Sequence, residues 1–206
     1  MVAPTATREA SLTHCHRLGL PINPQLPLLE DTLSLRPKLE IVDRSLCVCA
    51  MVYRAYGFPE VQVEAWIDRE ALLPKLSPSE VQFLHGDTSE AAQVQWQVEG
   101  LFAFAWLLSL VSEFEWDRRP PDTLINVFPD LRADESSARF RGSSILRPEC
   151  DALAALDCAY CVHWAAVELA LIRRSSPVEG RAVQERRRVI EWCLGSEEWD
   201  EVSLDT

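Results

Sequence analysis

The stretch RPECDALAALDCAYCVHWAAVELALIRR, residues 147–174, decides the fold. Its apolar residues predict one long helix from Pro148 to about Arg173. At 100° per residue, six bulky side chains form one stripe that we expect to face the core. Alanines occupy much of the remaining surface and let neighbouring helices come close, so this helix is predicted to be the central element. The stripe consists of Leu153, Leu156, Tyr160, Trp164, Val167 and Leu171.

Helical signals also dominate the rest of the chain, and strand signals are few. The sequence SPSEVQFL indicates a capping box, with Ser77 at the N-cap and Glu80 three residues later. A long helix from Glu90 to about Phe114 is strongly apolar in its second half, so we expect Trp106 to be buried there. Residues 1–206 are therefore predicted to form one compact all-α domain of about seven to nine helices. Further helices are predicted before Gly19, before Gly57, over Val61–Leu73 and over Gly180–Leu194.

Three segments are predicted to lack long helices. Pro21, Pro24 and Pro27 recur every third residue, which favours an extended strap over residues 21–30. This strap is interpreted as lying over the protein's own core, with a docking motif for a partner as the alternative. Residues 115–147 contain three prolines and a polar run, and we expect an irregular connection with one or two short helical turns. Residues 195–206 form an acidic tail.

Composition limits the classes of protein and partner that we consider. The chain has 206 residues, is 48% hydrophobic and carries a net charge of −12, which makes nucleic acid a poor partner and a basic protein a better one. The longest apolar run, Leu101–Val111, is too short to span a bilayer. No signal peptide is visible at the N-terminus, and the seven cysteines are scattered. The sequence therefore predicts a soluble, cytoplasmic protein without a cofactor.

The nine residues LDCAYCVHW, Leu156–Trp164, raise the question of a metal or redox site. On a helix, Cys158 and Cys161 are about 60° apart, but His163 lies about 140° and 160° from them, so the three cannot converge on one ion. A redox pair of cysteines belongs at a helix N-terminus, whereas these two lie in mid-helix. We therefore predict no metal site and expect buried, unreactive thiols.

Two acidic residues on the central helix require partners. Asp157 and Glu168 lie within about 20° of each other on the helical projection, and a buried charge needs a counter-charge. The next helix begins with the sequence AVQERRRVIEW, so we predict that Asp157 or Glu168 pairs with one of its arginines. Two interpretations remain open, a structural ion network or a functional polar pocket in which His163 is a general base near neutral pH. The polar pocket would be formed by Asp157, Tyr160, His163, Glu185 and Arg186, and the arginines available for pairing with Asp157 or Glu168 are Arg186, Arg187 and Arg188.

The acidic tail contains a tryptophan, Trp199, next to Asp200. A tail of acids alone would be disordered, so the tryptophan indicates an anchor that docks on the domain, near Arg186 to Arg188. The alternative is that the tail binds a basic partner.

The segments GLPINPQLP, WQVEGLFAFAWLL, RPECDALAALDCAYCVHWA, VQERRRVIEWC and WDEVSLDT occur in this order along the chain. In this the chain resembles a mostly bacterial family known as domain of unknown function 4272, over residues 8–206. The resemblance implies a compact helical domain and no established activity. Members of the resembled family commonly have an arginine at the positions of Gln97 and Cys161. This chain therefore departs from the family pattern by lacking these two cations. The most specific residues are Tyr160, His163, Trp164, Glu185, Arg186, Arg187, Trp199, Asp200, Asp205 and Thr206.

Two functions of different classes agree with these observations. A small acidic helical domain without a catalytic motif favours a non-enzymatic protein-interaction module, of the kind found among immunity or antitoxin-like proteins. The alternative is a small-molecule enzyme, such as a hydrolase, in which Asp157 or Glu185 orients His163. Whether His163 opens onto a cleft discriminates between them.

Overall fold

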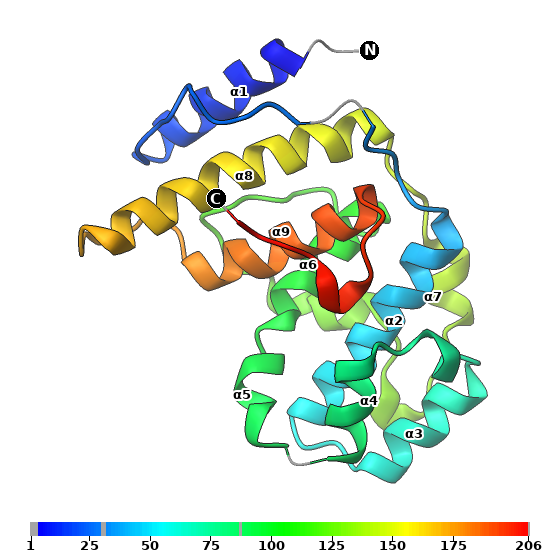
Figure 1. Ribbon diagram of the computed structural model, residues 1–206. Coiled ribbons are helices and arrows are strands. Elements are labelled where there is room, and N and C mark those ends of the chain that lie inside the picture. The colour runs from blue at the N-terminus through cyan, green and yellow to red at the C-terminus, as the bar shows by residue number, and fades with distance from the viewer. Residues whose placement is uncertain (1–3, 30–31, 87, 206) are drawn as a thin grey trace.

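A computed structural model describes residues 4–29, 32–86 and 88–205, and within these ranges it contains helices and no strand. Figure 1 shows the arrangement. The prediction of one all-α domain is confirmed. The α-helices are α1 (Pro4–Arg17), α2 (Lys38–Ala55), α3 (Glu60–Arg69), α4 (Pro78–His85), α5 (Ala91–Val94), α6 (Gln97–Leu107), α7 (Ala138–Ser143), α8 (Glu149–Leu171) and α9 (Gly180–Leu194). Short 3₁₀ helices span Leu73–Lys75, Thr88–Glu90, Asp122–Val127, Leu131–Ala133 and Trp199–Glu201.

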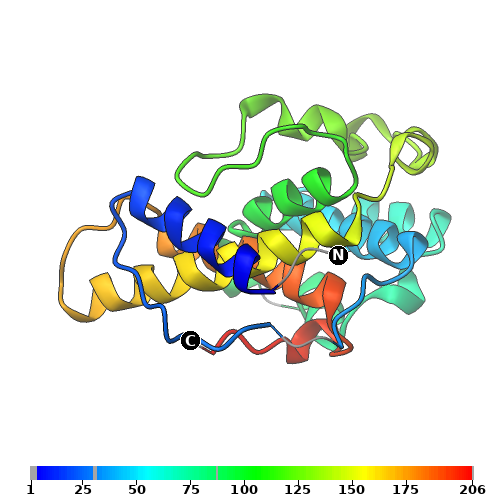
Figure 2. The same ribbon diagram turned by 90° about the horizontal axis from the view of Figure 1, so that it is seen from above.

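Helix α8 lies between two others. Helix α1 packs on one side of it and α9 on the other, and α9 also packs against α6. A second group forms around α2, which contacts α3, α4, α5 and α6. Viewed from above in Figure 2, α1 lies across α8, while the strap runs beside the C-terminal tail. Glu30, at the end of the predicted strap, and Thr206 lie outside the described residues.

The central place of α8 was predicted, but its buried face was predicted wrongly. Leu156 is fully buried, whereas the other five residues of the expected stripe are only partly buried or, at Leu171, 72% exposed. Small and polar residues occupy the contact faces, because α1 and α9 approach the helix most closely where side chains are short. The residues of α8 that are buried are Ala152, Leu156, Asp157, Ala159, Cys161, Val162, His163, Ala165, Ala166 and Leu169.

Helix α8 is also long and apolar enough to cross a membrane by length and composition. However, 56% of the most apolar 18-residue stretch of this helix is buried inside the protein. The helix therefore fits the core of a soluble protein.

The long helix expected over residues 90–114 is wrong in extent. The chain forms a 3₁₀ turn and the four-residue α5, turns at Gln95, and then forms α6, which ends at Leu107. The end is set by Ser109, whose φ of 56° is left-handed, while the amide of Leu110 donates to the carbonyl of Ala105. Trp106 is consequently only partly buried, and the predicted full burial is wrong.

The capping box at α4 is present as predicted. The amide of Glu80 donates to the Ser77 hydroxyl, and the Ser77 amide donates to the Glu80 carboxylate. The connection over residues 115–147 contains three short helices, one more than the upper number expected.

Candidate functional site

Asp157 is buried and paired, but its partner is not the predicted one. The Arg8 guanidinium of α1 donates to both carboxylate oxygens at 2.8–3.2 Å, and the two side chains are 6% and 3% exposed. The same guanidinium donates to the carbonyls of Leu26 and Pro27 at 2.6 and 2.8 Å. One arginine therefore joins α1, α8 and the strap.

The predicted pairing with Arg186, Arg187 or Arg188 of α9 is wrong, because these three arginines have other partners. Arg186 pairs with Glu99, Arg187 pairs with Glu191, and Arg188 donates to the carbonyl of Trp199. Glu168 is half-buried and forms no ion pair in the described parts of the chain. The physical argument that a buried carboxylate needs a cation holds for Asp157, but the cation comes from the far N-terminus.

His163 is only 7% exposed and accepts a hydrogen bond at Nδ1 from Arg187, 2.8 Å away. A guanidinium can only donate, so Nδ1 carries no proton. Burial, and then the nearby Arg187, lower the pKa of His163 to about 4. Such an imidazole is neutral at physiological pH and a weak base, which does not suit the general base near neutral pH that we considered.

The other residues of the expected polar pocket do not gather around His163. Tyr160 is half-buried between Arg187, 4.9 Å from its ring centroid, and Arg8, 6.0 Å away. Burial raises the pKa of Glu185 although Arg188 and Arg181 oppose the shift. Within the described residues, no hydrogen bond links His163 to a carboxylate. Arg187 is thus the centre of a structural network.

Arg186 forms a second buried network, which was not predicted. Its Nε and Nη2 donate to one oxygen of Glu99 at 2.9 and 2.6 Å, and both side chains are under 10% exposed. It also donates to the carbonyls of Glu115 and Arg118 at 2.6 and 2.7 Å. The pair therefore joins α9 and α6 to the connection that follows α6.

The cysteines are free and mostly buried. Burial raises the pKa of the Cys161 thiol to about 12, and burial likewise raises the pKa of the Cys158 thiol. Both therefore remain protonated and poorly nucleophilic at neutral pH. Over the described residues, no group of three or more His, Cys, Asp or Glu side chains is arranged to hold a metal ion.

The C-terminal tail is docked, as predicted. Trp199 is 3% exposed and stacks on Phe104, with the Arg188 guanidinium 4.5 Å from its ring centroid. Asp200 accepts hydrogen bonds from the hydroxyls of Ser77 and Ser79 and from the Ser79 amide. Burial opposes ionisation of Asp200, but these hydrogen bonds outweigh it and hold the pKa of its carboxyl below the usual value. The tail thus caps α4.

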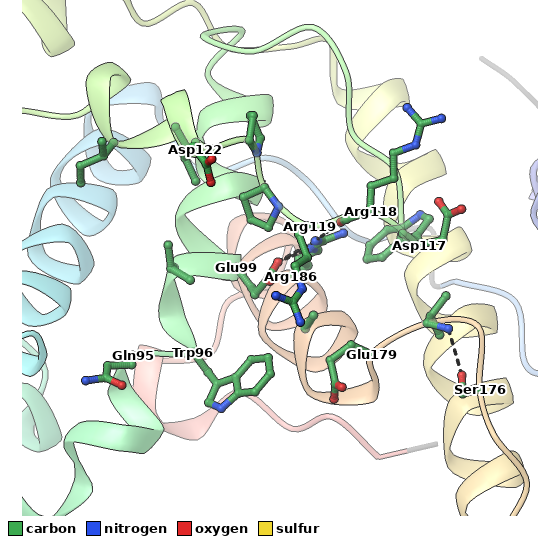
Figure 3. Close-up of a pocket in the computed structure, with 18 of the residues that line it drawn as sticks. Gln95, Trp96, Glu99, Asp117, Arg118, Arg119, Asp122, Ser176, Glu179 and Arg186 are labelled. Atoms are coloured by element: carbon green, nitrogen blue, oxygen red, sulfur yellow. Dashed lines mark hydrogen bonds and ion pairs between the residues drawn. The ribbon is translucent and has the colours of Figure 1, made fainter.

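The sequence did not reveal an open cleft of about 840 Å³ between the start of α6, the connection after it and the start of α9. Figure 3 shows the Glu99–Arg186 pair deep in this cleft, while Arg118 points away from it. Half-buried Trp96 and exposed Tyr56 supply aromatic rings to its wall, and Ile125 is 40% exposed at its edge.

Charged side chains of the cleft are partly unpaired. Arg119 is exposed and, among the described residues, has neither an ion pair nor a side-chain hydrogen bond. Asp122 and Glu179 also line the cleft without an ion pair from the described chain. The cleft therefore offers aromatic surface together with charges of both signs. Of the residues predicted for the polar pocket, Arg186 lines the cleft, whereas Asp157, Tyr160, His163 and Glu185 do not.

Comparison with known families agrees with the resemblance seen in the sequence. The profile of the family described as domain of unknown function DUF4272 matches residues 7–202. The chain belongs to this family. No curated protein and no solved structure matches the chain. In this DUF4272 member, the residues that carried the resemblance mostly hold the fold together: Arg186 and Arg187 form the two networks, and Trp199 anchors the tail.

Proposed function

We propose that this DUF4272 domain is a non-enzymatic protein-interaction domain whose partner binds in the cleft beside α6 and α9. The observation that carries the proposal is the cleft wall, which presents Tyr56, Trp96 and an unpaired Arg119. Tyrosine, tryptophan and arginine contribute most of the binding energy in measured protein interfaces. A concave surface with these side chains suits a protein segment.

The surroundings of His163 favour binding over catalysis. Its Nδ1 is occupied by Arg187, and Asp157, which was considered as its orienting carboxylate, is held by Arg8. A nucleophilic or acid–base mechanism needs these groups free to reach a substrate. Their hydrogen bonds instead connect segments that lie far apart in the sequence, and this agrees with a structural role.

The charge of the chain favours a basic partner. A net charge of −12 attracts a cationic protein at long range and accelerates its association. Asp122 and Glu179 at the cleft extend this preference to the site itself. Neutralising a basic protein in the cytoplasm, as immunity and antitoxin-like proteins do, is the form of this role that the charge favours.

Site-specific photo-crosslinking in the cells that produce the protein tests the proposal. A benzophenone amino acid replaces Tyr56, which is 65% exposed at the cleft. Leu39 is the matched control, since it is 69% exposed at the start of α2, whereas Tyr56 directly follows the end of this helix, about 25 Å away along its axis. We expect one protein to crosslink at position 56 in near-stoichiometric amount and not at position 39. A His163→Asn variant should capture the same protein.

Equal crosslinking at both positions, or none at position 56, would contradict the proposed cleft. Loss of the partner in His163→Asn, with the fold intact, would revive a role for the imidazole itself.

A further inference from the structure

Arginines stacked on aromatic rings recur throughout this protein. In each case the guanidinium carbon lies 4.4–6.0 Å from a ring centroid. A ring covers one face of the planar guanidinium and leaves its N–H groups free to donate in the plane. The stacked arginines are Arg8, Arg36, Arg44, Arg147, Arg181, Arg186, Arg187 and Arg188.

Seven of these eight arginines donate to backbone carbonyls of segments outside α-helices. Arg36, for example, lies over the Trp192 ring and donates to the carbonyl of Glu197 at 2.6 Å. Extended segments have carbonyls without helical partners, and an arginine fork satisfies them. We call such an arginine, with its ring, a carbonyl clamp. The carbonyl acceptors outside α-helices belong to Leu26, Pro27, Lys75, Val111, Ser112, Glu115, Arg118, Glu197, Trp199, Leu204 and Asp205.

Arg181 is the exception. Its guanidinium lies 5.5 Å from the Trp96 ring centroid, yet its side chain makes no hydrogen bond or ion pair with any described residue. The side chain is half-buried and is therefore held in place without an acceptor. Five of the other seven arginines also pair with a carboxylate. Arg147 and Arg188 have a ring and a carbonyl acceptor but no ion pair with a described residue, and Arg181 differs from these two only in lacking the carbonyl acceptor.

The vacant clamp lies where two hollows meet. Trp96 lines the 840 Å³ cleft, and Arg181 lines an adjoining hollow of about 660 Å³ together with Gln93 and Gln184. Arg119 offers a second unpaired guanidinium in the cleft. An extended segment that lies along both hollows would pass directly over the Arg181–Trp96 pair.

We propose that Arg181 and Trp96 form a carbonyl clamp for an extended segment of a partner protein, which rests on the interaction role proposed above. A backbone segment suits the site better than a free anion. Most hydrogen bonds of the filled clamps are donated to neutral carbonyls, and the carboxylates of Glu179, Glu185 and Asp205 around the two hollows repel anions.

The test starts with a random-peptide library displayed on phage and selected on the full-length chain. The affinity of the selected peptides is then measured by fluorescence anisotropy. We expect Arg181→Met to weaken binding by about tenfold or more, because the hydrogen bonds that the charged guanidinium donates to peptide carbonyls are lost. Arg181→Lys should weaken it nearly as much, since lysine has no planar fork. Arg174→Met removes an equal charge from an exposed arginine without a ring beneath it and should leave affinity unchanged.

A backbone contact has its own signature. Replacing single peptide amides by esters weakens the carbonyl acceptor, so one such ester should reduce binding to the wild type but not to Arg181→Met. The unfolding midpoint should be nearly unchanged in Arg181→Met, because the Arg181 side chain makes no hydrogen bond or ion pair with a described residue.

Peptides that bind equally to wild type and Arg181→Met, or a library that yields no binder, would overturn the clamp. If Arg181→Met still captures the protein crosslinked at position 56 with unchanged affinity, the clamp is wrong but the interaction role stands. If nothing crosslinks at position 56, the interaction role itself fails.

Discussion

The Arg8–Asp157 pair offers the sharpest test of what holds the central helix in place. Replacing Arg8 by Met leaves a buried carboxylate that, among the described residues, accepts side-chain hydrogen bonds from that guanidinium alone. Breaking one side of a buried pair costs about 3–5 kcal/mol. Arg8→Met also removes two hydrogen bonds to the strap, each contributing about 1 kcal/mol. We therefore expect Arg8→Met to lower the free energy of unfolding by about 5–7 kcal/mol.

The partner substitution should cost less, and the two should not add. In Asp157→Leu the Arg8 guanidinium still donates hydrogen bonds to the carbonyls of Leu26 and Pro27. We therefore expect the free energy of unfolding to fall by about 3–4 kcal/mol. The double variant Arg8→Met, Asp157→Leu leaves no buried charge and should be at least as stable as Arg8→Met alone. Asp151→Asn, an exposed acid on the same helix, is the control and should stay within about 0.5 kcal/mol of wild type.

Urea unfolding followed by circular dichroism at 222 nm measures these four variants. Additive single losses, with the double variant the least stable of all, would refute the view that charge burial dominates at this site.

Three further outcomes are expected. The pKa of His163 is lowered to about 4 from an unfolded value of about 6.5, so the unfolded chain binds the proton first as the pH falls. The free energy of unfolding should therefore fall by up to about 3 kcal/mol between pH 6.5 and pH 4. Urea midpoints measured over this pH range check the prediction, and the pH dependence should be weaker in His163→Asn. Asp200→Ala should cost about 1–2 kcal/mol through loss of the α4 cap and should speed proteolysis of the tail, with exposed Glu201→Ala as control. A thiol reagent at neutral pH should react rapidly with the exposed Cys150 alone, so Cys150→Ser should abolish the fast phase.

Local patterns in the sequence were enough to predict most of the helices. Capping residues and glycines at helix ends act within a few residues, so α4 and α9 begin where the pattern indicated. The end of α6 at Leu107 was missed because it depends on the left-handed backbone conformation of Ser109. Serine is not a residue type from which this conformation would be predicted. The buried face of α8 was missed for another reason. The prediction assumed that the largest apolar side chains face the core, whereas α1 and α9 pack on the faces where alanines allow close approach.

The ion pairs were mispredicted because sequence proximity was a poor guide to them. Arg8 and Asp157 are 149 residues apart, and Arg186 and Glu99 are 87 residues apart. The pattern predicted that Asp157 or Glu168 on α8 would need a cation, but the topology determined that Asp157 is the paired carboxylate and that Arg8 is its partner.

One signal in the sequence does point to the carbonyl clamps, namely the choice of cation. Lys38 and Lys75 are the lysines of the chain, and the other eighteen basic residues are arginines. Charge alone would not favour arginine so strongly, because either residue neutralises a carboxylate. A planar fork that stacks on a ring while donating to several carbonyls requires arginine. Arginine is therefore abundant because this helical domain holds its proline-rich and irregular segments by side-chain clamps in place of strand pairing. The pair of Arg181 and Trp96 has the same guanidinium and ring, but no carbonyl of a described residue accepts a hydrogen bond from it.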